Sequence, residues 1–350
     1  TQIDSLISEL QADAHCPVRR ITGIPSFLSI ADSSLKLSTL RAYNRGDILG
    51  MDISSGIAAL ALSPTPGDNI LDLCCAPGAK LLFLAELLQS QGSVTGVDIA
   101  EHRAATCRSL VKKHAGDDKI RIRVFVEDGT TFGERAPRHG WSEPELVRQA
   151  AKMDPVDPKS VRRPWFASKM LASPFALSGS DLYDRVLVDA ECTHDGSLVH
   201  IKKYEQWGYD KLAAQVISDD RSSTVPVLQS KLLENGWRLL KPGGTLVYST
   251  CSLSRFQNEA VVGGFLKRHP DAALQPISVF GPESAITPTK IWTPDTFKND
   301  ETRHIFDRMQ HAARLDPLVS NTSGMFIARI YKPLTSTHAC QEQEIVPLDI

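Results

Sequence analysis

The sequence lacks the long apolar run that crosses a membrane, since no stretch approaches the ~18 consecutive apolar residues that a spanning helix needs. It also lacks an excess of charge of one sign, because 39 basic residues face 41 acidic ones, for a net charge of −2. Apolar residues make up 42% and charged residues 23%, which is typical of a globular protein and excludes a disordered or collagen-like chain. Any nucleic-acid site must therefore come from local clusters of Lys and Arg.

Cysteine is scarce, and its spacing is irregular. An odd count with no CxxC pair suits neither a disulfide framework nor a zinc site, so we expect reduced thiols and no metal. Reduced thiols indicate an intracellular protein, in the nucleus, cytoplasm or mitochondrion. The first twenty residues carry three acids and no apolar stretch, and they do not predict a secretory signal. The seven cysteines are Cys16, Cys74, Cys75, Cys107, Cys192, Cys251 and Cys340.

Short apolar runs alternate with helical periodicities from residue 51 onward. This alternation predicts an α/β fold with a mostly parallel sheet and helices on both faces. The expected strands lie at 69–74, 93–99, 120–128, 183–192, 245–251 and 325–332, and the expected helices at 51–63, 80–90, 101–114, 198–240 (two helices) and 254–269. The Lys-Pro-Gly-Gly sequence at 241–244 predicts a turn.

The domain organisation follows from where this alternation begins and ends. We expect an N-terminal extension of helices and loops over 1–50, a main domain over 51–335 and a tail over 336–350. Within the main domain, the Pro-rich stretch near 132–182 and the stretch near 281–320 show no clear periodicity, and we expect them to be insertions.

The loop CCAPGAK at 74–80 joins the first expected strand to a helix. Ligands of open α/β sheets bind at the carboxyl ends of the strands, near the point where the strand order reverses. The loop matches neither GxxxxGK[ST] nor GxGxxG, the two patterns that cradle phosphate. One Gly after a Pro permits close backbone approach but offers little to a pyrophosphate. The loop therefore favours a cofactor without phosphate groups.

Acidic residues end the next two expected strands. Asp98 is placed to hold the hydroxyls of a ribose. Glu127 and Asp128 lie where an adenine amine would need an acceptor. A nucleoside without phosphates indicates S-adenosylmethionine, although each acid can equally be a turn or cap residue.

Two cysteines follow the fourth and fifth expected strands. These strands should be neighbours, so the thiols of Cys192 and Cys251 should face one cleft. A thiolate that adds to carbon 6 of cytosine makes carbon 5 nucleophilic enough to accept a methyl group. A general base must then remove the carbon-5 proton, and a protonated Asp189 can hydrogen-bond the activated ring. The alternatives are two packed cysteines or a redox pair, and packing is the expected role of Cys16, Cys107, Cys340 and the Cys74–Cys75 pair.

At this point the chain resembles a known family. ILDLCCAPGAK, VDAEC and LVYSTCSLSRFQNE, preceded by GMDISSGIAALAL and followed by SGMFIARI, are similar to the RNA (cytosine carbon-5) methyltransferases of the NOL1/NOP2/Sun (RsmB-like) family, over roughly 40–332. The resemblance implies a class I S-adenosylmethionine-dependent methyltransferase fold, with tRNA or rRNA as methyl acceptor. It further implies that Cys251 is the nucleophile, that Cys192 assists proton removal and enzyme release, and that Asp189 contacts base and cofactor. The residues implied for cofactor binding are Cys75, Ala76, Pro77, Gly78, Lys80, Asp98, Arg103, Asp128 and Asp189.

Two positions depart from the family pattern. Glu191 stands where the family usually has Pro, and Ala79 stands where it usually has a second Gly. The Glu191 substitution keeps open a second hypothesis, a weakly active or inactive member that acts as an RNA-binding or ribosome-assembly factor. The Pro-Cys-Gln and Glu-Asn-Val motifs of DNA cytosine methyltransferases are absent, which favours RNA over DNA.

Basic residues gather beside aromatic ones in two places. Residues 148–169 hold six Lys or Arg against two acids, and Pro164 alone separates Arg162 and Arg163 from Trp165 and Phe166. Lys202 and Lys203 lie close to Trp207 in the sequence. Cations joined to aromatics are typical of single-strand binding, but a solvated loop with a packed Trp is an equal alternative. We expect a monomer that binds RNA, and the sequence does not identify a protein partner.

Overall fold

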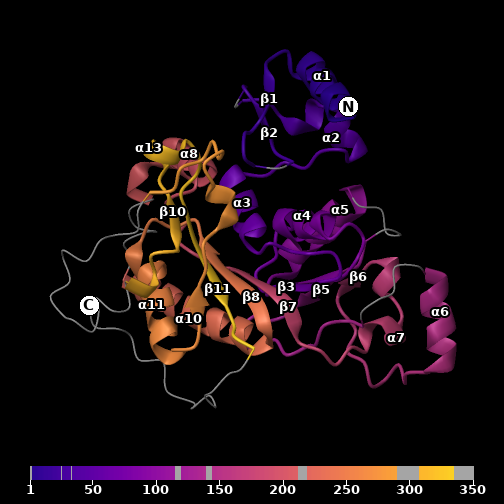
Figure 1. Ribbon diagram of the computed structural model, residues 1–350. Helices are drawn as coiled ribbons and strands as arrows, with labels where there is room; N and C mark the ends of the chain where they lie inside the picture. Colours follow the sequence, from indigo (N-terminus) through magenta and orange to yellow (C-terminus); the bar gives the residue numbers. More distant parts are fainter. Residues whose placement is uncertain are drawn as a thin grey trace.

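The computed structural model describes residues 2–24, 26–32, 34–114, 120–138, 144–211, 219–289 and 307–334. These residues form a small N-terminal unit above a larger α/β domain (Figure 1). Within the described ranges, no helix has the length and apolar character that a membrane span requires.

One mixed sheet of nine strands organises the α/β domain. Its order is β10-β11-β8-β7-β3-β4-β5-β6, and β9 pairs with β11 outside this path. The five central strands from β8 to β5 are parallel, whereas β6, β9, β10 and β11 are antiparallel to their neighbours. The predicted α/β fold is confirmed. The strands are β3 (Asn69–Asp72), β4 (Ser93–Asp98), β5 (Ile122–Val126), β6 (Phe166–Ala167), β7 (Tyr183–Asp189), β8 (Leu240–Thr250), β9 (Ala273–Leu274), β10 (Ala313–Leu315) and β11 (Met325–Tyr331).

Helices cover both faces of the sheet (Figure 1). On one face, α3 (Ile53–Ala61), α4 (Ala79–Leu87) and α5 (Glu101–His114) bury a core that includes Ile57 and Leu81. On the other face, α10 (Asp219–Leu239) and α11 (Glu259–Arg268) bury a second core around Trp237. The chain order reverses between β3 and β7, so the loops after these strands lie at the switch point where ligands bind.

The N-terminal unit has its own small core, formed around Leu10 and Leu40. It contains a two-stranded antiparallel sheet that the sequence did not predict, because three-residue strands are too short to show periodicity. Its elements are α1 (Gln2–Ala14), β1 (Val18–Arg20), β2 (Leu28–Ile30), η1 (Leu37–Thr39) and α2 (Arg41–Arg45).

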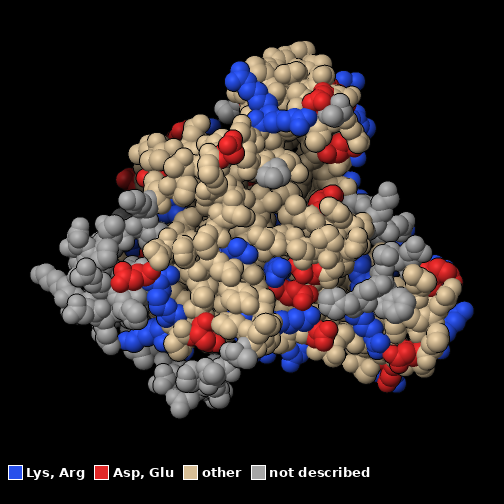
Figure 2. Space-filling view, viewed as in Figure 1, with Lys and Arg blue, Asp and Glu red and all other residues tan. Residues whose placement is uncertain are grey.

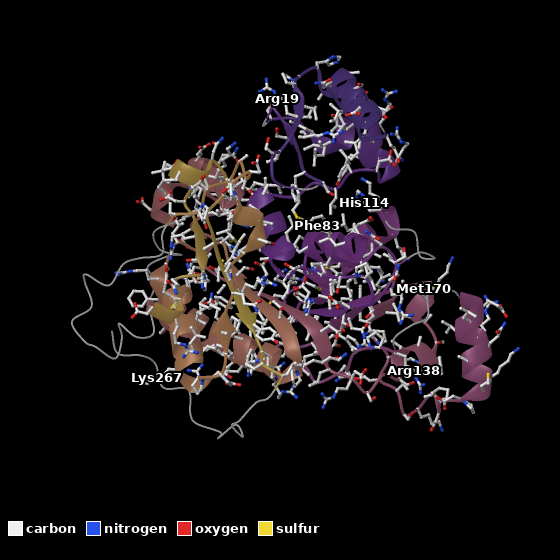
Figure 3. The ribbon with its side chains drawn as sticks, in the orientation of Figure 1. Arg19, Phe83, His114, Arg138, Met170 and Lys267 are labelled. Carbon is white, nitrogen blue, oxygen red and sulfur yellow. The ribbon has the colours of Figure 1, made fainter. Side chains whose placement is uncertain are left out.

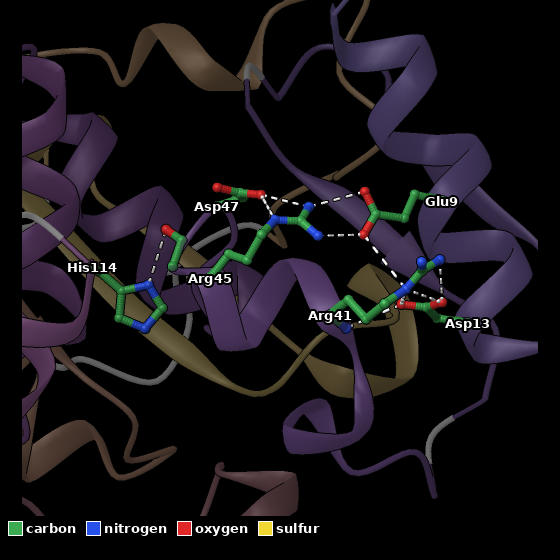
Figure 4. Close-up of polar contacts among 7 residues, drawn as sticks. Glu9, Asp13, Arg41, Arg45, Asp47 and His114 are labelled. Atoms are coloured by element: carbon green, nitrogen blue, oxygen red, sulfur yellow. Dashed lines mark hydrogen bonds and ion pairs between the residues drawn. The ribbon is translucent and has the colours of Figure 1, made fainter.

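Ion pairs hold α2 against α1 (Figure 4). Arg45 bridges Glu9, at 2.8 Å, and Asp47, at 2.7 Å, while Arg41 pairs with Asp13. The next contact leads out of the unit, where the His114 ring of α5 lies with Nδ1 3.3 Å from the Gly46 carbonyl oxygen. The turn after α2 therefore links the N-terminal unit to the main domain.

The two expected insertions contain defined elements, and the expected turn at 241–244 lies within a strand. The stretch 132–182 contains α6 (Pro144–Met153), β6, η2 (Lys169–Leu171) and α7 (Pro174–Leu177), with a separate small core around Phe175. The expected turn at 241–244 lies within β8, because a shift of register against β7 and a positive φ of 80° at Gly243 absorb the bend.

The described parts of 281–320 are not wholly irregular either. They contain β10, which extends the sheet, and α13 (Pro317–Ser320). The short helix η4 (Ser278–Phe280) comes before this stretch, and β11 comes after it. Two further elements, α8 (Leu198–Trp207) and η3 (Arg255–Gln257), follow the ends of β7 and β8 along the chain. The expected tail at 336–350 and Cys340 lie outside the described residues.

Candidate active site

The loop after β3 is fixed by backbone contacts to β4 and α5. The Cys75 amide donates to the Val97 carbonyl at 2.9 Å. Gly78 caps α4 with a φ of 107°, and a Cβ at this position would lie 2.9 Å from the Cys107 Cα. Only glycine meets both conditions without strain. The loop also contains a cis bond between Ala76 and Pro77.

Asp98 and Arg103 hold this loop from the next strand and helix. One Asp98 oxygen accepts from the Ala76 amide at 3.3 Å, and the other accepts from the Ala100 amide at 3.0 Å. Arg103 donates to the Ala76 carbonyl at 3.0 Å and lies 3.6 Å from the Asp98 carboxylate. Asp128 likewise caps a turn, because its Oδ1 accepts from the Thr130 amide and hydroxyl at 2.8 Å each. Asp98 and Asp128 therefore both act as turn residues. Their carboxylates have further lone pairs that could accept bonds from a cofactor, and this second role stays a prediction.

Lys80 joins the cofactor loop to the end of β7. Its Nζ lies 2.7 Å from Asp189 Oδ2, and the Ser249 hydroxyl donates to Asp189 Oδ1 at 2.7 Å. Burial opposes the charged form of Lys80, but the ion pair with Asp189 outweighs it and raises the pKa of Lys80. Lys80 therefore remains a cation and orients Asp189.

Asp72, the last residue of β3, was missed by the sequence reasoning. It is fully buried, and its Oδ1 accepts from the Cys74 amide at 3.2 Å. Within the described part of the chain, its Oδ2 has no hydrogen-bond partner. Burial raises the pKa of Asp72 to about 7, with Lys80 opposing the shift. The sequence did offer a signal for Asp72, because an acidic residue ends the first strand of the α/β domain two residues before the cofactor loop.

These residues fit S-adenosylmethionine. Asp98 and Asp189 both act electrostatically on Asp72, and two cations, Lys80 and Arg103, lie beside these three acids. The edge of the sheet therefore carries a surplus of negative charge, together with one buried carboxylate oxygen that lacks a donor. A cofactor with a sulfonium and an ammonium group supplies both the opposite charge and the missing donor.

The two predicted thiols lie side by side. Cys192 follows β7 and Cys251 follows β8, and these strands pair in parallel with Asp189 opposite Ser249. The sulfur atoms are 3.4 Å apart. His194, which the sequence reasoning missed, lies with Nδ1 3.0 Å from the Cys251 sulfur and 3.5 Å from the Cys192 sulfur. No periodicity or motif marked His194, because its position depends on the path of the loop.

The hydrogen bond between the thiols separates their acidities. The bond from Cys251 lowers the pKa of Cys192 to about 6, against the effect of burial, and His194 lowers it further. The same bond raises the pKa of Cys251. Because the sulfurs share one proton, the pair loses its first proton readily and holds the second.

Polar contacts tie the two thiol loops to each other and to α10. The Thr193 amide donates to the Gln257 side chain at 3.1 Å, and the Gly196 amide donates to the Cys251 carbonyl at 2.9 Å. Asp195 accepts from the Leu253 amide at 3.0 Å.

The Glu191 carbonyl accepts from Gln229 of α10 at 2.7 Å. This contact uses a backbone carbonyl, which any residue at this position supplies, and with Glu191 in place of Pro the two sulfurs are in contact.

The expected RNA-binding residues differ in their surroundings. Arg162 is paired with Glu127 at 2.8 Å and lies 3.5 Å from Glu134. Trp165 lies under the Arg108 guanidinium and donates to Glu101 at 3.3 Å, and both its role in RNA binding and the alternative of a packed Trp stay predictions.

The other expected RNA-binding residues are exposed, as Arg162 is. Arg163 is exposed, as are Lys202, Lys203 and Trp207 on α8. Figure 2 shows basic and acidic side chains interspersed over one face, without a single broad basic area. The role of these residues in RNA binding stays a prediction.

A cavity of about 1060 Å³ lies away from this chemistry, between the N-terminal unit and α4. It is lined largely by apolar side chains, such as Leu6, Phe27 and Leu82, and by none of the residues predicted for the cofactor or the thiols. Phe83 and His114 lie on the side of the main domain that faces the N-terminal unit (Figure 3). Because its lining is apolar, this space is not where we place the reaction.

The sheet order and the loops at its switch point define the fold of S-adenosylmethionine-dependent methyltransferases. A solved methyltransferase homologue from Pyrococcus horikoshii shares this fold, with a TM-score of 0.62 and 23% identity over 94% of this chain and 82% of that one. The structure described as PH0851 gives a TM-score of 0.65 and 26% identity, over 94% of this chain and 56% of that one.

The family model described as 16S rRNA methyltransferase RsmB/F matches residues 59–134 and 170–331, and the chain belongs to this family. The resemblance inferred from the sequence is thereby confirmed.

Three curated relatives illustrate the range of the family. The bovine 5-cytosine rRNA methyltransferase NSUN4 is 32% identical over 62% of this chain and 44% of its own length. The tRNA (cytosine(49)-C(5))-methyltransferase of Pyrococcus abyssi is 26% identical over 83% of this chain and 72% of its own length. The probable ribosomal RNA small subunit methyltransferase B of Bacillus subtilis is 28% identical over 65% of this chain and 39% of its own length. The chain thus spans less than half the length of two of these relatives.

Proposed function

We propose that the protein methylates carbon 5 of cytosine in tRNA or rRNA, with S-adenosylmethionine as donor. One observation carries the proposal: two thiols from adjacent parallel strands lie 3.4 Å apart, beside a carboxylate held by the cofactor-loop lysine. Membership of a methyltransferase family supports it, as do relatives whose names specify cytosine in rRNA and tRNA.

The chain's own residues divide the work of holding cofactor and base. The loop from Cys75 to Lys80 would lie against the cofactor, with Asp72 available to an ammonium group and Asp98 and Asp128 to the nucleoside. When bound, S-adenosylmethionine supplies the electrophilic methyl group. Asp189, fixed by Lys80 and Ser249, would hydrogen-bond the cytosine ring.

The thiols would carry the covalent steps. The Cys251 thiol would pass its proton to the adjacent Cys192 thiolate. The Cys251 sulfur then forms a bond to carbon 6, and the electron pair of the 5,6 double bond moves toward carbon 5, which becomes the nucleophile. After methylation, a base removes the carbon-5 proton, the double bond re-forms and the Cys251 sulfur leaves carbon 6. Cys192 is placed to assist this departure, because its sulfur touches that of Cys251.

A second candidate function is an RNA-binding or ribosome-assembly factor that retains the fold. Glu191 is the observation that favours it, since the residue puts a carboxylate beside the thiol loop. Against it stands the geometry, because Glu191 leaves the thiol pair and the Lys80–Asp189 pair intact.

The test uses labelled S-adenosylmethionine with unmodified tRNA and rRNA, followed by identification of the labelled nucleoside. We expect 5-methylcytidine from the wild type and none from Cys251→Ala. Cys192→Ala should accumulate a protein–RNA adduct that survives denaturing electrophoresis, because release of the thiol is impaired. Cys16→Ala, in the N-terminal unit, is the matched control and should behave as wild type.

Two outcomes would contradict the proposal. Methylation that survives Cys251→Ala would remove the covalent mechanism. RNA binding without any label, in the presence of saturating cofactor, would favour the assembly factor.

A further inference from the structure

Three soft donor atoms converge at the ends of β7 and β8. The sulfurs of Cys192 and Cys251 and the Nδ1 of His194 all lie within 4.8 Å of one another. The separations are 3.4 Å between the sulfurs, and 3.0 and 3.5 Å from the nitrogen to the sulfurs of Cys251 and Cys192. Spacing along the chain hid this group, because the cysteines are 59 residues apart and form no CxxC pair.

The triangle is close to one face of a tetrahedral zinc site. With Zn–S bonds of about 2.3 Å and Zn–N bonds of about 2.0 Å, tetrahedral angles place the sulfurs about 3.8 Å apart and nitrogen and sulfur about 3.5 Å apart. The observed separations are shorter by no more than ~0.6 Å, which small rotations of the side chains supply. Thiolate and imidazole are the ligands that zinc prefers over carboxylate-selective ions such as magnesium.

The surrounding loops hold the donors in place before any ion arrives. The Gly196–Cys251 and Thr193–Gln257 hydrogen bonds join the two thiol loops, as described above. The His194 ring stacks on His200, with ring centroids 4.6 Å apart and planes 11° apart. His200 is itself held by Ser197, at 2.9 Å from its Nδ1. Such outer contacts orient a metal-binding histidine and strengthen the site.

We propose that Cys192, His194 and Cys251 bind one zinc-like cation. The two sulfurs bind as thiolates and His194 binds through Nδ1, so that binding displaces any proton held on these three atoms. The fourth position is open to water, as in sites with three protein ligands. Asp189 and Glu191 add negative charge nearby, and both interact electrostatically with His194.

The ion would act as a reversible inhibitor. A bound cation engages both thiols, so Cys251 cannot attack cytosine until the ion is removed. This consequence rests on the proposed function, whereas the site itself rests only on the three donors. It also shields both thiols from alkylation and oxidation, since their lone pairs are engaged.

The test is spectroscopic and needs no RNA. The full chain, stripped of metal and kept reduced, is titrated with Co²⁺ and then with Zn²⁺. We expect a 1:1 complex with thiolate charge-transfer absorption in the near ultraviolet and the visible bands of four-coordinate Co²⁺, both lost when Zn²⁺ displaces Co²⁺. Excess Mg²⁺ should leave the spectrum unchanged.

Variants assign the ligands. Cys192→Ser, Cys251→Ser and His194→Gln should each lose the 1:1 complex. Cys16→Ser should keep it, because Cys16 lies in the N-terminal unit and supplies no donor. His200→Gln should keep the 1:1 stoichiometry but bind more weakly, because it loses the ring that orients His194. Far-ultraviolet circular dichroism confirms that each variant is folded. A spectrum that is absent in the wild type, or unchanged in His194→Gln, would overturn the proposal.

The activity arm separates this inference from the proposed function. We expect Zn²⁺ to stop methyl transfer in the wild type and a chelator to restore it. A wild type that binds one Co²⁺ through thiolates but never methylates RNA supports the metal site and rejects the proposed function. A wild type that methylates RNA but binds no Co²⁺ supports the proposed function and rejects the metal site.

Discussion

At the scale of single residues, Asp72 is the most unusual group, because it is a fully buried carboxyl with one oxygen that lacks a donor among the described residues. Burial raises its pKa from 3.8 to about 7. A carboxyl whose pKa is raised on folding stabilises the fold below its unfolded pKa and loses this contribution as the pH rises through the folded pKa. The cofactor-free protein should therefore become less stable between about pH 4 and about pH 8.

Asp72→Asn should remove this loss. At about 1.4 kcal/mol per pKa unit, the variant should gain up to about 4 kcal/mol on the wild type across that range. Chemical denaturation at several pH values measures the difference, with the exposed Asp157→Asn as control. An unchanged pH dependence in Asp72→Asn would show that the carboxyl is not strained by burial.

Gly78 gives a second prediction, with Gly67 as its matched control. Both have a positive φ, of 107° and 97°, but a Cβ would strike the Cys107 backbone only at Gly78. Gly67→Ala should cost about 1–2 kcal/mol from backbone strain alone. Gly78→Ala should cost more, and it should also weaken binding of S-adenosylmethionine, as measured by calorimetry. Equal costs would mean that the loop moves away from α5 freely.

The sequence predicts site residues that lie at or just after strand ends, but not those whose position depends on the path of a loop. Cys192, Cys251, Asp189 and Lys80 follow strand ends in a βαβ pattern, and strand ends at one edge of a sheet must converge. His194 joins them through the local path of its loop, including a φ of 57°, which no periodicity encodes.

At the scale of elements, the strands of the central sheet were predictable because each is a buried apolar run between turn residues. Residues 132–182 were not, because their small core around Phe175 is assembled from short pieces rather than from one periodic face. The expected turn at 241–244 lies inside β8 rather than before it, because the pairing with β7 is interrupted between Leu240 and Thr245 and resumes after the bend.

An ion pair between elements supplies the third prediction. Arg314 of β10 donates to both carboxylate oxygens of Glu259 of α11, at 2.6 and 2.7 Å. It also donates at 2.9 Å to the carbonyl of Leu253, two residues after Cys251. The side chains of Arg314 and Glu259 are 14% and 3% exposed, so Glu259→Gln leaves a nearly buried guanidinium without its counter-charge. We expect a loss of about 3 kcal/mol in the free energy of unfolding.

The matched control is the exposed pair of Glu145 and Arg148 on α6. Glu145→Gln should change stability by less than about 0.5 kcal/mol. Denaturant titration compares the two variants, and similar losses would contradict the role given to burial.

At the scale of the whole molecule, charge is balanced and RNA contacts have to be local. Arg162 is engaged by Glu127 and Glu134, whereas Lys202 and Lys203 are exposed on α8, which follows the thiol loop. We expect Lys202→Gln and Lys203→Gln to weaken RNA binding more than Arg162→Gln does. Each lost phosphate contact should lower the slope of log affinity against log salt by about 0.7 for a single strand. Fluorescence anisotropy over a salt series tests this, and unchanged slopes would place the RNA elsewhere.

The parallel pairing of β7 with β8 has a consequence for how the chain matures. Contacts between segments 59 residues apart form late, because a long loop must close first. A slip of one residue in this pairing would turn Asp189 to the opposite face of the sheet and separate the sulfurs. A nascent chain therefore acquires its reactive pair only when the central sheet has closed in register. The rate at which a short bifunctional thiol reagent crosslinks Cys192 to Cys251 during refolding would report when the two strands pair in register.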